Sequence, residues 1–531
     1  MSRYSALAGV LALTLLFAAL GARLDAVYLW PLVLLAPLSG LGLWNLVQPQ
    51  HSLLRNYPLL AHFRWLFETI RPEIRQYLIE GDQDAWPFDR RQRSLVYQRA
   101  KAALDNQPFG TQLDVDAVGY HWIAHSIRPT PVNREPLRVV VGGPDCARPY
   151  SASLLNISAM SFGSLSPNAI RALNKGARLG GFAHDTGEGG ISRYHREFGG
   201  DLIWEIGSGY FGCRRDDGSF DADMFAEQAE RDQVRMVEIK LSQGAKPGHG
   251  GILPGAKVTA EIAAARRVPV GVDCISPNRH SAFSTPIEMM HFIRTLRERC
   301  GGKPVGFKLC IGQRWEFLAL CKAMLATGIQ PDFIVVDGAE GGTGAAPLEF
   351  SDHVGTPMKD GLTFVHNALV GVGLRRQIRI GASGKIISAF DMAQTISLGA
   401  DWCNAARGFM FALGCVQSRS CHTNRCPTGV ATQDALRNRS LVVEDKSERV
   451  CQFHHKTLEA LAELASAAGL DHPSGFKPQH FRHRMRTGTV MSGEEFYEHL
   501  EPNELLDGTD KPSFALHWQL ARADSFAPLA P

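Results

Sequence analysis

Residues 333–344 read Phe-Ile-Val-Val-Asp-Gly-Ala-Glu-Gly-Gly-Thr-Gly, an apolar run that ends in an acidic residue and a glycine-rich loop. A short strand followed by such a loop is typical of one βα unit in a parallel sheet. The pattern recurs on both sides of this stretch. We expect strands at 154–158, 182–185, 236–240, 270–274, 305–309, 333–337, 378–381 and 402–405. We expect helices at 167–179, 256–266, 286–299, 315–327 and 389–398.

Eight such units match the ~250-residue size of a closed barrel. The sequence therefore predicts an α/β protein built on a (β/α)8 TIM barrel, with a doubly wound open sheet as the alternative. In a barrel of this kind the functional residues lie at the carboxyl ends of the strands. The residues that follow each predicted strand are therefore the first candidates for a site.

The composition is that of a folded protein. The chain has 531 residues, of which 45% are hydrophobic and 21% are charged, and its net charge is +3. These values exclude a disordered chain and give no reason to expect nucleic acid as a partner. Eleven cysteines in a chain of this length indicate reduced thiols or metal ligands rather than a disulfide framework.

The first fifty residues contain only three charged residues, Arg3, Arg23 and Asp25. Apolar runs at 4–20 and 26–47 approach the ~20 residues that a helix needs to cross a bilayer. We expect a two-helix membrane anchor, with a cleaved signal peptide as the alternative. Four arginines follow the second run, at positions 55, 64, 71 and 75. The positive-inside rule then predicts an inner (cytoplasmic) membrane location, with the catalytic body in the cytoplasm.

The chain is expected to divide into four parts. Residues 1–50 form the anchoring hairpin, and 51–143 form a helical juxtamembrane segment. Residues 144–434 form the barrel together with a cysteine-containing loop. Residues 435–531 form a small helical C-terminal extension.

Glycine-rich loops follow several predicted strands, at 187–190, 341–344 and 384. Without a Cβ, the backbone amides of such loops can approach a phosphate, although a tight turn explains a single loop equally well. Lys240, Lys246 and Lys308 also stand at or just beyond strand ends. If they converge on the barrel mouth, they create a positive field suited to a flavin anion or a carboxylate substrate.

Three cysteines follow the last predicted strand with the spacing C-x5-C-x4-C-P, at Cys415, Cys421 and Cys426. Closely spaced thiolates of this kind are typical of iron–sulfur clusters, and zinc is the rival. Three ligands indicate a cluster with three irons, or a four-ligand site completed by His422 or Cys451. The other seven cysteines stand singly in apolar surroundings and are expected to be unligated.

Residues 144–434 resemble the FMN-binding synthase domain of glutamate synthase, here in a stand-alone form. The resemblance rests on Asn168 and on six motifs: Ser158-Ala-Met-Ser-Phe-Gly163, Thr186-Gly-Glu-Gly-Gly190, Gln243-Gly-Ala-Lys-Pro-Gly248, Ile275-Ser-Pro277, Gly341-Gly-Thr-Gly-Ala345 and Cys421-His-Thr-Asn-Arg-Cys-Pro-Thr-Gly-Val-Ala-Thr-Gln433. It implies a barrel that holds FMN beside a 3Fe-4S iron–sulfur cluster. In that family the reduced flavin delivers hydride to an imine of 2-oxoglutarate.

The resemblance also implies a role for each matching residue. Ala159, Met160 and Ser161 would line the flavin ring, and Gln243 and Lys308 would contact its polar edge. The FMN phosphate would be held by Gly342, Thr343, Gly384 and Gly408. Lys246 and Glu188 would be the catalytic, substrate-site residues, and Cys415, Cys421 and Cys426 would ligate the cluster.

The sequence departs from the family at several places. The amidotransferase domain expected before the barrel is replaced by the apolar hairpin. His249 stands where an acidic residue is expected, and the loop at 278–281 also differs.

The leading interpretation is a membrane-anchored FMN and iron–sulfur oxidoreductase that reductively aminates a 2-oxo acid, or runs the reverse reaction. The alternatives are an N-methylglutamate synthase-like enzyme, an electron-transfer flavoprotein without amino-acid chemistry, and a scaffold that has lost the flavin. The expected partners are a small 2-oxo acid or amino acid, a ferredoxin-like or flavoprotein electron donor, and the membrane.

Overall fold

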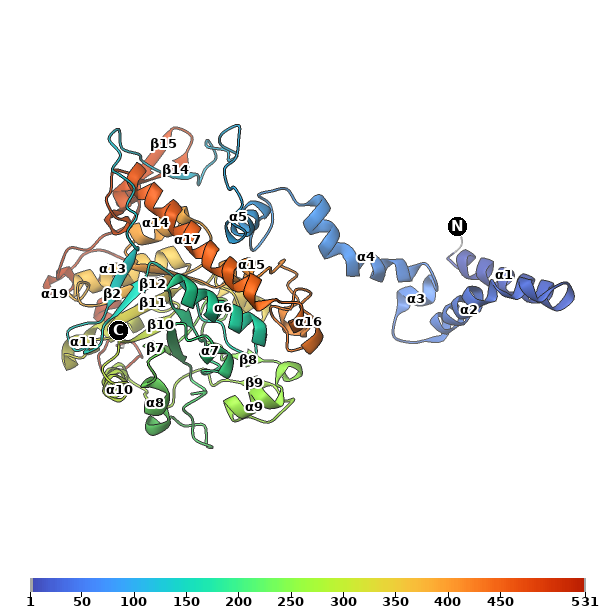
Figure 1. The fold of residues 1–531 in the computed structure, drawn as a ribbon, viewed down its shortest axis with the longest axis horizontal. Coiled ribbons are helices and arrows are strands. Elements are labelled where there is room, and N and C mark those ends of the chain that lie inside the picture. The colour runs from blue at the N-terminus through green and yellow to red at the C-terminus, as the bar shows by residue number, and fades with distance from the viewer. Residues whose placement is uncertain (1–2, 530–531) are drawn as a thin grey trace. The chain divides into compact units, whose positions relative to one another are not determined.

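The computed structural model describes residues 3–529, which form two compact units divided after Arg91. Figure 1 shows the elements of both.

The first unit is helical. Its elements are α1 (Ser5–Arg23), the 3-10 turn η1 (Ala26–Leu29), α2 (Leu32–Val47), α3 (Ser52–Asn56), α4 (Ala61–Ile74) and the π-helical turn η2 (Arg75–Ile79). Two stretches, Ser5–Arg23 and Ala26–Val47, are long and apolar enough to cross a membrane, with mean hydropathies of 2.1 and 1.8. They contact each other as a hairpin, in which the Thr14 and Ser39 hydroxyl oxygens lie 2.8 Å apart. Few of their residues are buried within the protein.

The second unit is a closed eight-stranded parallel barrel, as the sequence predicts, and the alternative of an open sheet is excluded. The strands in chain order are β4 (Leu155–Ile157), β5 (His184–Asp185), β6 (Leu202–Ile206), β7 (Val234–Lys240), β10 (Val305–Leu309), β11 (Phe333–Asp337), β12 (Arg379–Ser383) and β13 (Trp402–Ala405). Each pairs with its neighbours in sequence order, and β13 closes the barrel against β4.

Seven of the eight predicted strands belong to this barrel, and one does not. The prediction at 270–274 is wrong, because Val270 and Val272 are exposed and only Cys274 enters a strand. That strand, β9 (Cys274–Ile275), pairs antiparallel with β8 (Ile252–Leu253) in a long excursion that follows β7. The eighth barrel strand is β6, which the sequence reading missed because Glu205 interrupts its apolar run.

The predicted barrel helices are all present. They are α6 (Pro167–Gly180), η3 with α9 (Gly255–Lys257 and Ala260–Arg266), α10 (Pro286–Arg299), α11 (Arg314–Thr327) and α14 (Ala389–Ser397). The first begins where Ser166 caps the Ala169 amide and Pro167 presets the backbone. Further helices are α5 (Arg90–Ala100), α7 (Arg193–Arg196), α8 (Ala222–Ala229), α12 (Leu348–His353), α13 (Met358–Gly371), α15 (Arg407–Ala412) and α16 (Ala435–Arg439).

The amino end of the barrel is filled by apolar side chains. Ala183, Ile203, Met236, Phe333 and Trp402 form one buried cluster with Tyr150 and Ala152. The last two belong to a hairpin of β2 (Arg138–Val141) and β3 (Tyr150–Ser153), which covers this end. The opposite, carboxyl end is therefore the one available for a site.

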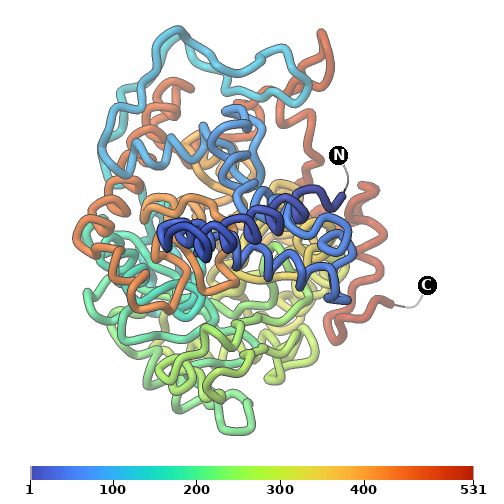
Figure 2. Tube along the Cα trace, turned by 90° about the vertical axis from the view of Figure 1, so that its right-hand side faces the viewer, coloured from blue at the N-terminus to red at the C-terminus, as the bar shows by residue number. Residues whose placement is uncertain are grey.

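The C-terminal region packs on the outside of the barrel. The long helix α17 (Val443–Ala467) lies along α6 (Figure 1), where Gly176 leaves room for Val450. A three-stranded sheet joins β1 (His121–Ile123) to β14 (Phe481–Arg486) and β15 (Thr489–Ser492). Three short helices follow, α18 (Gly493–Phe496), α19 (Glu504–Asp507) and α20 (Ala515–Leu520). The last lies beside α11, where Lys322 donates to the Trp518 carbonyl, and Figure 2 shows this terminal segment in red at the surface.

Candidate functional site

A carboxylate surrounded by cations stands at the carboxyl end of the barrel. Glu188 follows β5, and its Oε2 lies 3.0 Å from Nζ of Lys240 at the end of β7. Burial alone would raise the pKa of Glu188, but Lys240, Arg266 and Lys246 lower it to about 2. Three cations around one carboxylate leave an excess of positive charge at this place.

Lys246 lies in the loop that follows β7. It is buried, its Nζ donates to the Ala345 carbonyl at 3.1 Å, and burial lowers its pKa to about 8. The same loop is held to the loop after β11, because the Gly244 amide donates to Asp337 Oδ2 at 2.8 Å. A Cβ at Gly244 would lie 1.8 Å from the Gly338 carbonyl oxygen, so only glycine allows the two loops to approach so closely. The loops that carry Lys246 and the glycine run at 341–344 are therefore fixed against each other.

The predicted phosphate-binding glycines gather around Arg407 and Glu340. A Cβ at Gly342 would lie 3.0 Å from Arg407 Cδ, and one at Gly384 would lie 3.0 Å from Glu340 Oε1. Arg407 Nη2 donates to the Glu340 carbonyl at 2.7 Å and directly precedes Gly408 in the chain. Thr343 is exposed.

Two cations accompany these glycines. Burial lowers the pKa of Arg407 to about 10, and burial together with the charge of Arg407 lowers the pKa of Lys385. Two desolvated cations close to each other and beside glycine loops fit a phosphate dianion. Arg407 was not predicted from the sequence, because the phosphate site after the last strand was assigned to Gly408, the next residue.

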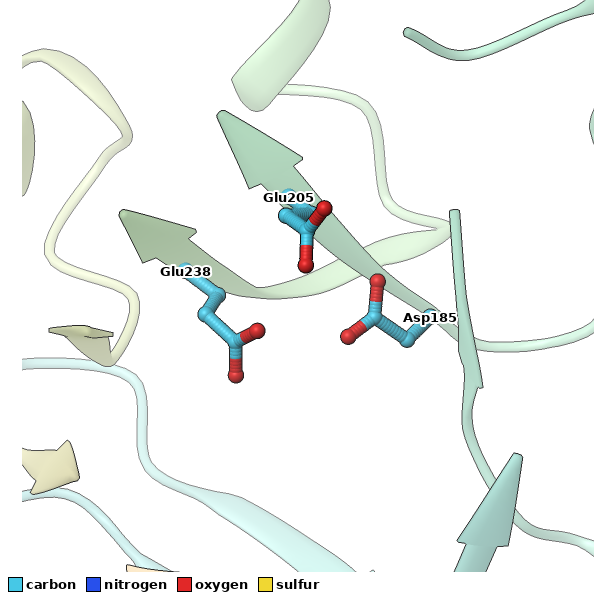
Figure 3. Close-up of side chains that lie close together, drawn as sticks. All are labelled: Asp185, Glu205 and Glu238. Carbon is cyan, nitrogen blue, oxygen red and sulfur yellow. The ribbon is translucent and has the colours of Figure 1, made fainter. Parts of the chain in front are cut away.

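Lys308 lies deeper in the barrel than the other lysines. It is buried, forms an ion pair with Glu205, and has its Nζ 3.2 Å from Glu238 Oε1. Figure 3 shows the carboxyl groups of Glu205 and Glu238 facing that of Asp185, from the neighbouring strands β6, β7 and β5.

Burial dominates the ionisation of this group. It raises the pKa of Asp185 and Glu238, with Glu238 adding to the effect on Asp185. Burial would lower the pKa of Lys308, but Glu205 and Glu238 raise it well above its usual value. Sequence reasoning found Lys308 and missed the three carboxyl groups. The available signal was one acidic residue in each of three strands, with Glu205 and Glu238 inside β6 and β7 and Asp185 at the end of β5.

The loop after β4 carries Ala159, Met160 and Ser161. Met160 is buried, while the other two are half-buried, as is Gln243. This loop touches the one that carries Glu188, because a Cβ at Gly187 would lie 2.6 Å from the Ser161 nitrogen. The residues predicted to line a flavin and the predicted substrate-site residue Glu188 are therefore on adjoining loops.

The three cysteines of the C-x5-C-x4-C segment lie near one another. Burial, with the other two thiols adding to it, raises the pKa of Cys415 to about 12, and burial and Cys426 raise that of Cys421. Within residues 3–529, no three cysteine sulfurs lie within 4.8 Å of one another. Zinc–sulfur bonds of ~2.3 Å would place the sulfurs of a tetrahedral site only about 3.8 Å apart. Among the described residues the three thiols are therefore not gathered as closely as the ligands of a single zinc ion would be.

Cys426 differs from the other two thiols. Burial would raise its pKa, but hydrogen bonds from the Ala431 amide and from Thr428 lower it. Amide donors of this kind stabilise a thiolate, the form that binds metal. Cys451 lies elsewhere, with its Sγ 3.8 Å from His455 Nδ1 on α17.

The cysteine segment, taken here with the residues that follow it up to Gln433, is bonded to the loop after β4. Gln433 Nε2 donates to the carbonyls of Gly163 at 3.0 Å and Leu165 at 2.8 Å. Lys257 Nζ bridges the same two segments, with the Ser164 carbonyl at 2.6 Å and the Cys421 carbonyl at 3.4 Å. A group held by the cysteines would therefore adjoin the barrel mouth.

Comparison with known proteins agrees with this architecture. Residues 146–471, more than half of the chain, match the family described as the conserved region in glutamate synthase. The glutamate synthase large subunit-like protein YerD of Bacillus subtilis (strain 168) is 39% identical over 84% of this chain and 92% of its own length. The archaeal-type glutamate synthase [NADPH] of Thermotoga neapolitana is 35% identical over 59% of each chain.

Among solved structures, a flavocytochrome b2 mutant with pyruvate bound has a TM-score of 0.43 at 13% identity, over 83% of this chain and 91% of its own. That likeness is too distant to support an inference. The barrel, its charged mouth and the sequence match define an α/β-barrel enzyme, an oxidoreductase. The chain belongs to the glutamate synthase family.

Proposed function

We propose that this chain is an FMN- and iron–sulfur-dependent oxidoreductase that reductively aminates a 2-oxo acid, converting 2-oxoglutarate to glutamate, or runs the reverse reaction. The observation that carries the proposal is the bonded junction between the cysteine segment and the loop after β4, beside the charged mouth. A redox centre next to a cationic substrate pocket is the arrangement that such a reaction requires. When bound, FMN supplies the conversion between one-electron and hydride transfer.

The FMN phosphate binds at Gly342, Thr343, Gly384 and Gly408, where Arg407 and Lys385 provide the positive charge. Ala159, Met160 and Ser161 line the ring, and Gln243 contacts its polar edge. Lys308 would contact the same edge, and its ion pairs with Glu205 and Glu238 keep it protonated.

The substrate is a dicarboxylate, because the mouth holds more positive charge than Glu188 neutralises. Lys246 and Arg266 bind its carboxylates, while Lys240 pairs with Glu188. The 2-oxo acid and ammonia lose water to form an imine, and the imine takes up two electrons and two protons to become the amino acid. The side chains hold the imine carboxylates and compensate charge as it develops.

Cys415, Cys421 and Cys426 hold an iron–sulfur cluster, most simply of the 3Fe-4S type, since Cys451 is directed to His455. When bound there, such a cluster would supply one-electron transfer chemistry, for which a ferredoxin-like protein or a partner flavoprotein would be the electron donor.

The first unit anchors the enzyme to the inner face of a membrane. The stretches Ser5–Arg23 and Ala26–Val47 span the bilayer. After them, α4 carries Phe63, Trp65 and Phe67 exposed together with Arg64, a combination suited to the lipid interface.

The test is anaerobic purification of the full-length protein in detergent. We expect about one FMN and one iron–sulfur cluster per chain, from the extracted flavin, iron analysis and electron paramagnetic resonance. Colourless protein without flavin or iron would refute the proposal. Activity with methylamine but not ammonium would instead identify an N-methylglutamate synthase-like enzyme.

A further inference from the structure

A cavity of about 330 Å³ lies in the barrel wall, apart from the charged mouth. It is formed by β6, by the segment from Gly189 to Arg196 that includes α7, and by α8 and α9, which Figure 1 shows on the same side of the barrel. Its volume is at the lower end of the range for small-molecule sites, roughly 300–1,000 Å³. None of the residues assigned above to FMN, substrate or cluster lines it.

Two buried N–H donors of the cavity lining lack an acceptor. Trp204 is on β6 between Ile203 and Glu205, which face the barrel interior, so its side chain faces outward, stacked on Phe225. It is fully buried, and its Nε1 has no hydrogen-bond partner among the described residues. Arg214 is half-buried, and its Nε atom is likewise buried without a hydrogen-bond partner among the described residues. Because buried donors are nearly always satisfied, these two call for an acceptor in the cavity.

The charge of the lining also favours an anion. Four arginines contribute to it, Arg193, Arg196, Arg214 and Arg267, against the single carboxylate of Glu261. That carboxylate is already paired with Arg193, 2.8 Å from its Nε. Arg267 Nη1 donates to the Arg214 carbonyl at 3.1 Å, and its one ion pair, with the exposed Asp216 at 3.3 Å, is screened by water. The guanidinium groups of Arg196 and Arg214 form no ion pair within residues 3–529.

We propose that this cavity is a second binding site, for a small oxyanion that carries carboxylate or phosphate groups. The indole N–H of Trp204 and the guanidinium of Arg214 donate to one oxyanion group, and Arg196 and Arg267 supply further charge at the rim. Arginine suits both ligand chemistries, because its planar donors match carboxylate and phosphate alike.

The position of the site connects it to the mouth. Phe162 and Gly189 line the cavity, and each directly follows a residue of the mouth, Ser161 and Glu188. A ligand there would contact the reverse side of the loops that carry the reaction site.

The test is titration calorimetry on the full-length, FMN-loaded protein in detergent, with inorganic phosphate and succinate as separate probes. We expect at least one probe to bind with a Kd in the millimolar range or below, and the tighter probe identifies the chemical class. Trp204→Phe keeps an aromatic side chain and removes the N–H donor, so the Kd should rise about 5-fold, as the loss of a neutral hydrogen bond implies. Arg214→Gln removes a charged donor and should raise the Kd at least 10-fold, roughly as the loss of a charged hydrogen bond implies. Arg215→Gln is the matched control, because Arg215 pairs with Asp221 outside the cavity and Kd should not change.

Circular dichroism and thermal unfolding check that each variant is folded. Absence of binding of both probes to the wild-type protein would overturn the proposal. Binding that neither Trp204→Phe nor Arg214→Gln weakens would place the anion at the mouth or the phosphate loops, and would overturn it as well.

Discussion

At the scale of single residues, the mouth of the barrel depends on Lys246. Its pKa of about 8 is low for a lysine because the side chain is buried, while Glu188, with a pKa of about 2, stays ionised throughout the neutral range. The positive charge of Lys246, which we propose binds a substrate carboxylate, is therefore present below pH 8 and is lost as the pH rises through that value.

We predict that the KM for 2-oxoglutarate rises above pH 8, approaching 10-fold for each further pH unit. In Lys246→Arg the rise should be absent up to pH 10, because arginine keeps its charge. Steady-state kinetics from pH 6 to 10 check this. An identical pH profile of KM in both proteins would contradict the role given to Lys246.

The buried ion pairs of Lys308 are expected to stabilise the folded barrel. Lys308→Met leaves the carboxyl groups of Glu205 and Glu238 without their counter-ion, and removing one partner of a buried ion pair costs roughly 3–5 kcal/mol. Urea unfolding should show this loss. The double variant Lys308→Met/Glu205→Gln should recover part of it. A single variant as stable as the wild type would show that the ion pairs do not support the barrel.

Sequence reasoning found some of these residues and missed others for a physical reason. The positions of Lys246 and Glu188 were predictable, because each follows a strand inside a recognisable motif. The partners of Lys308 were not, since Asp185, Glu205 and Glu238 are far from it in sequence and meet it only when the barrel closes. In the sequence, the only indication of these buried carboxyl groups was an acidic residue in or at the end of a strand.

At the scale of elements, the cysteine segment can be tested against a matched control. Cys421→Ser removes a proposed ligand, so iron content and the electron paramagnetic resonance signal should fall by about 90%, while FMN remains bound. Cys451→Ser should leave both unchanged, because Cys451 contacts His455 on α17. Equal loss of iron in the two variants would mean that the cluster has other ligands.

The charges around the N-terminal hairpin predict its orientation in the membrane. The turn between α1 and η1 should face away from the cytoplasm, because the arginines follow the second span. A cysteine introduced by Asp25→Cys should therefore react with a membrane-impermeant maleimide in intact cells, and Gln50→Cys should react only after lysis. Labelling of Gln50→Cys in intact cells would reverse the orientation, and a protein found in the soluble fraction would exclude the anchor.

The elements themselves were predictable where local signals agreed. Helix α10 was predicted to the residue, since Thr285 and Glu288 form a capping box around Pro286. The β8–β9 excursion was not, because an exposed Val-Gly-Val segment and a buried barrel strand have similar composition. Only tertiary packing, which buries all five residues of β6, distinguishes them.

At the scale of the whole molecule, one chain carries the cysteine segment, where we propose that electrons enter, the cationic barrel mouth, where we propose that the substrate binds, and an apolar hairpin. The first two adjoin through Lys257 and Gln433, which bond the cysteine segment to the loop after β4. Substitution of either residue should slow electron transfer between the two sites without removing the cofactors.

The central claim is that electrons held by this protein pass to an imine formed from a 2-oxo acid. The most direct measurement is stopped-flow absorbance of the dithionite-reduced protein under argon, mixed with 2-oxoglutarate and ammonium together. The account predicts that flavin absorbance returns as glutamate forms, one molecule for each two electrons. Protein that stays reduced with this mixture, and with methylamine in place of ammonium, would contradict it.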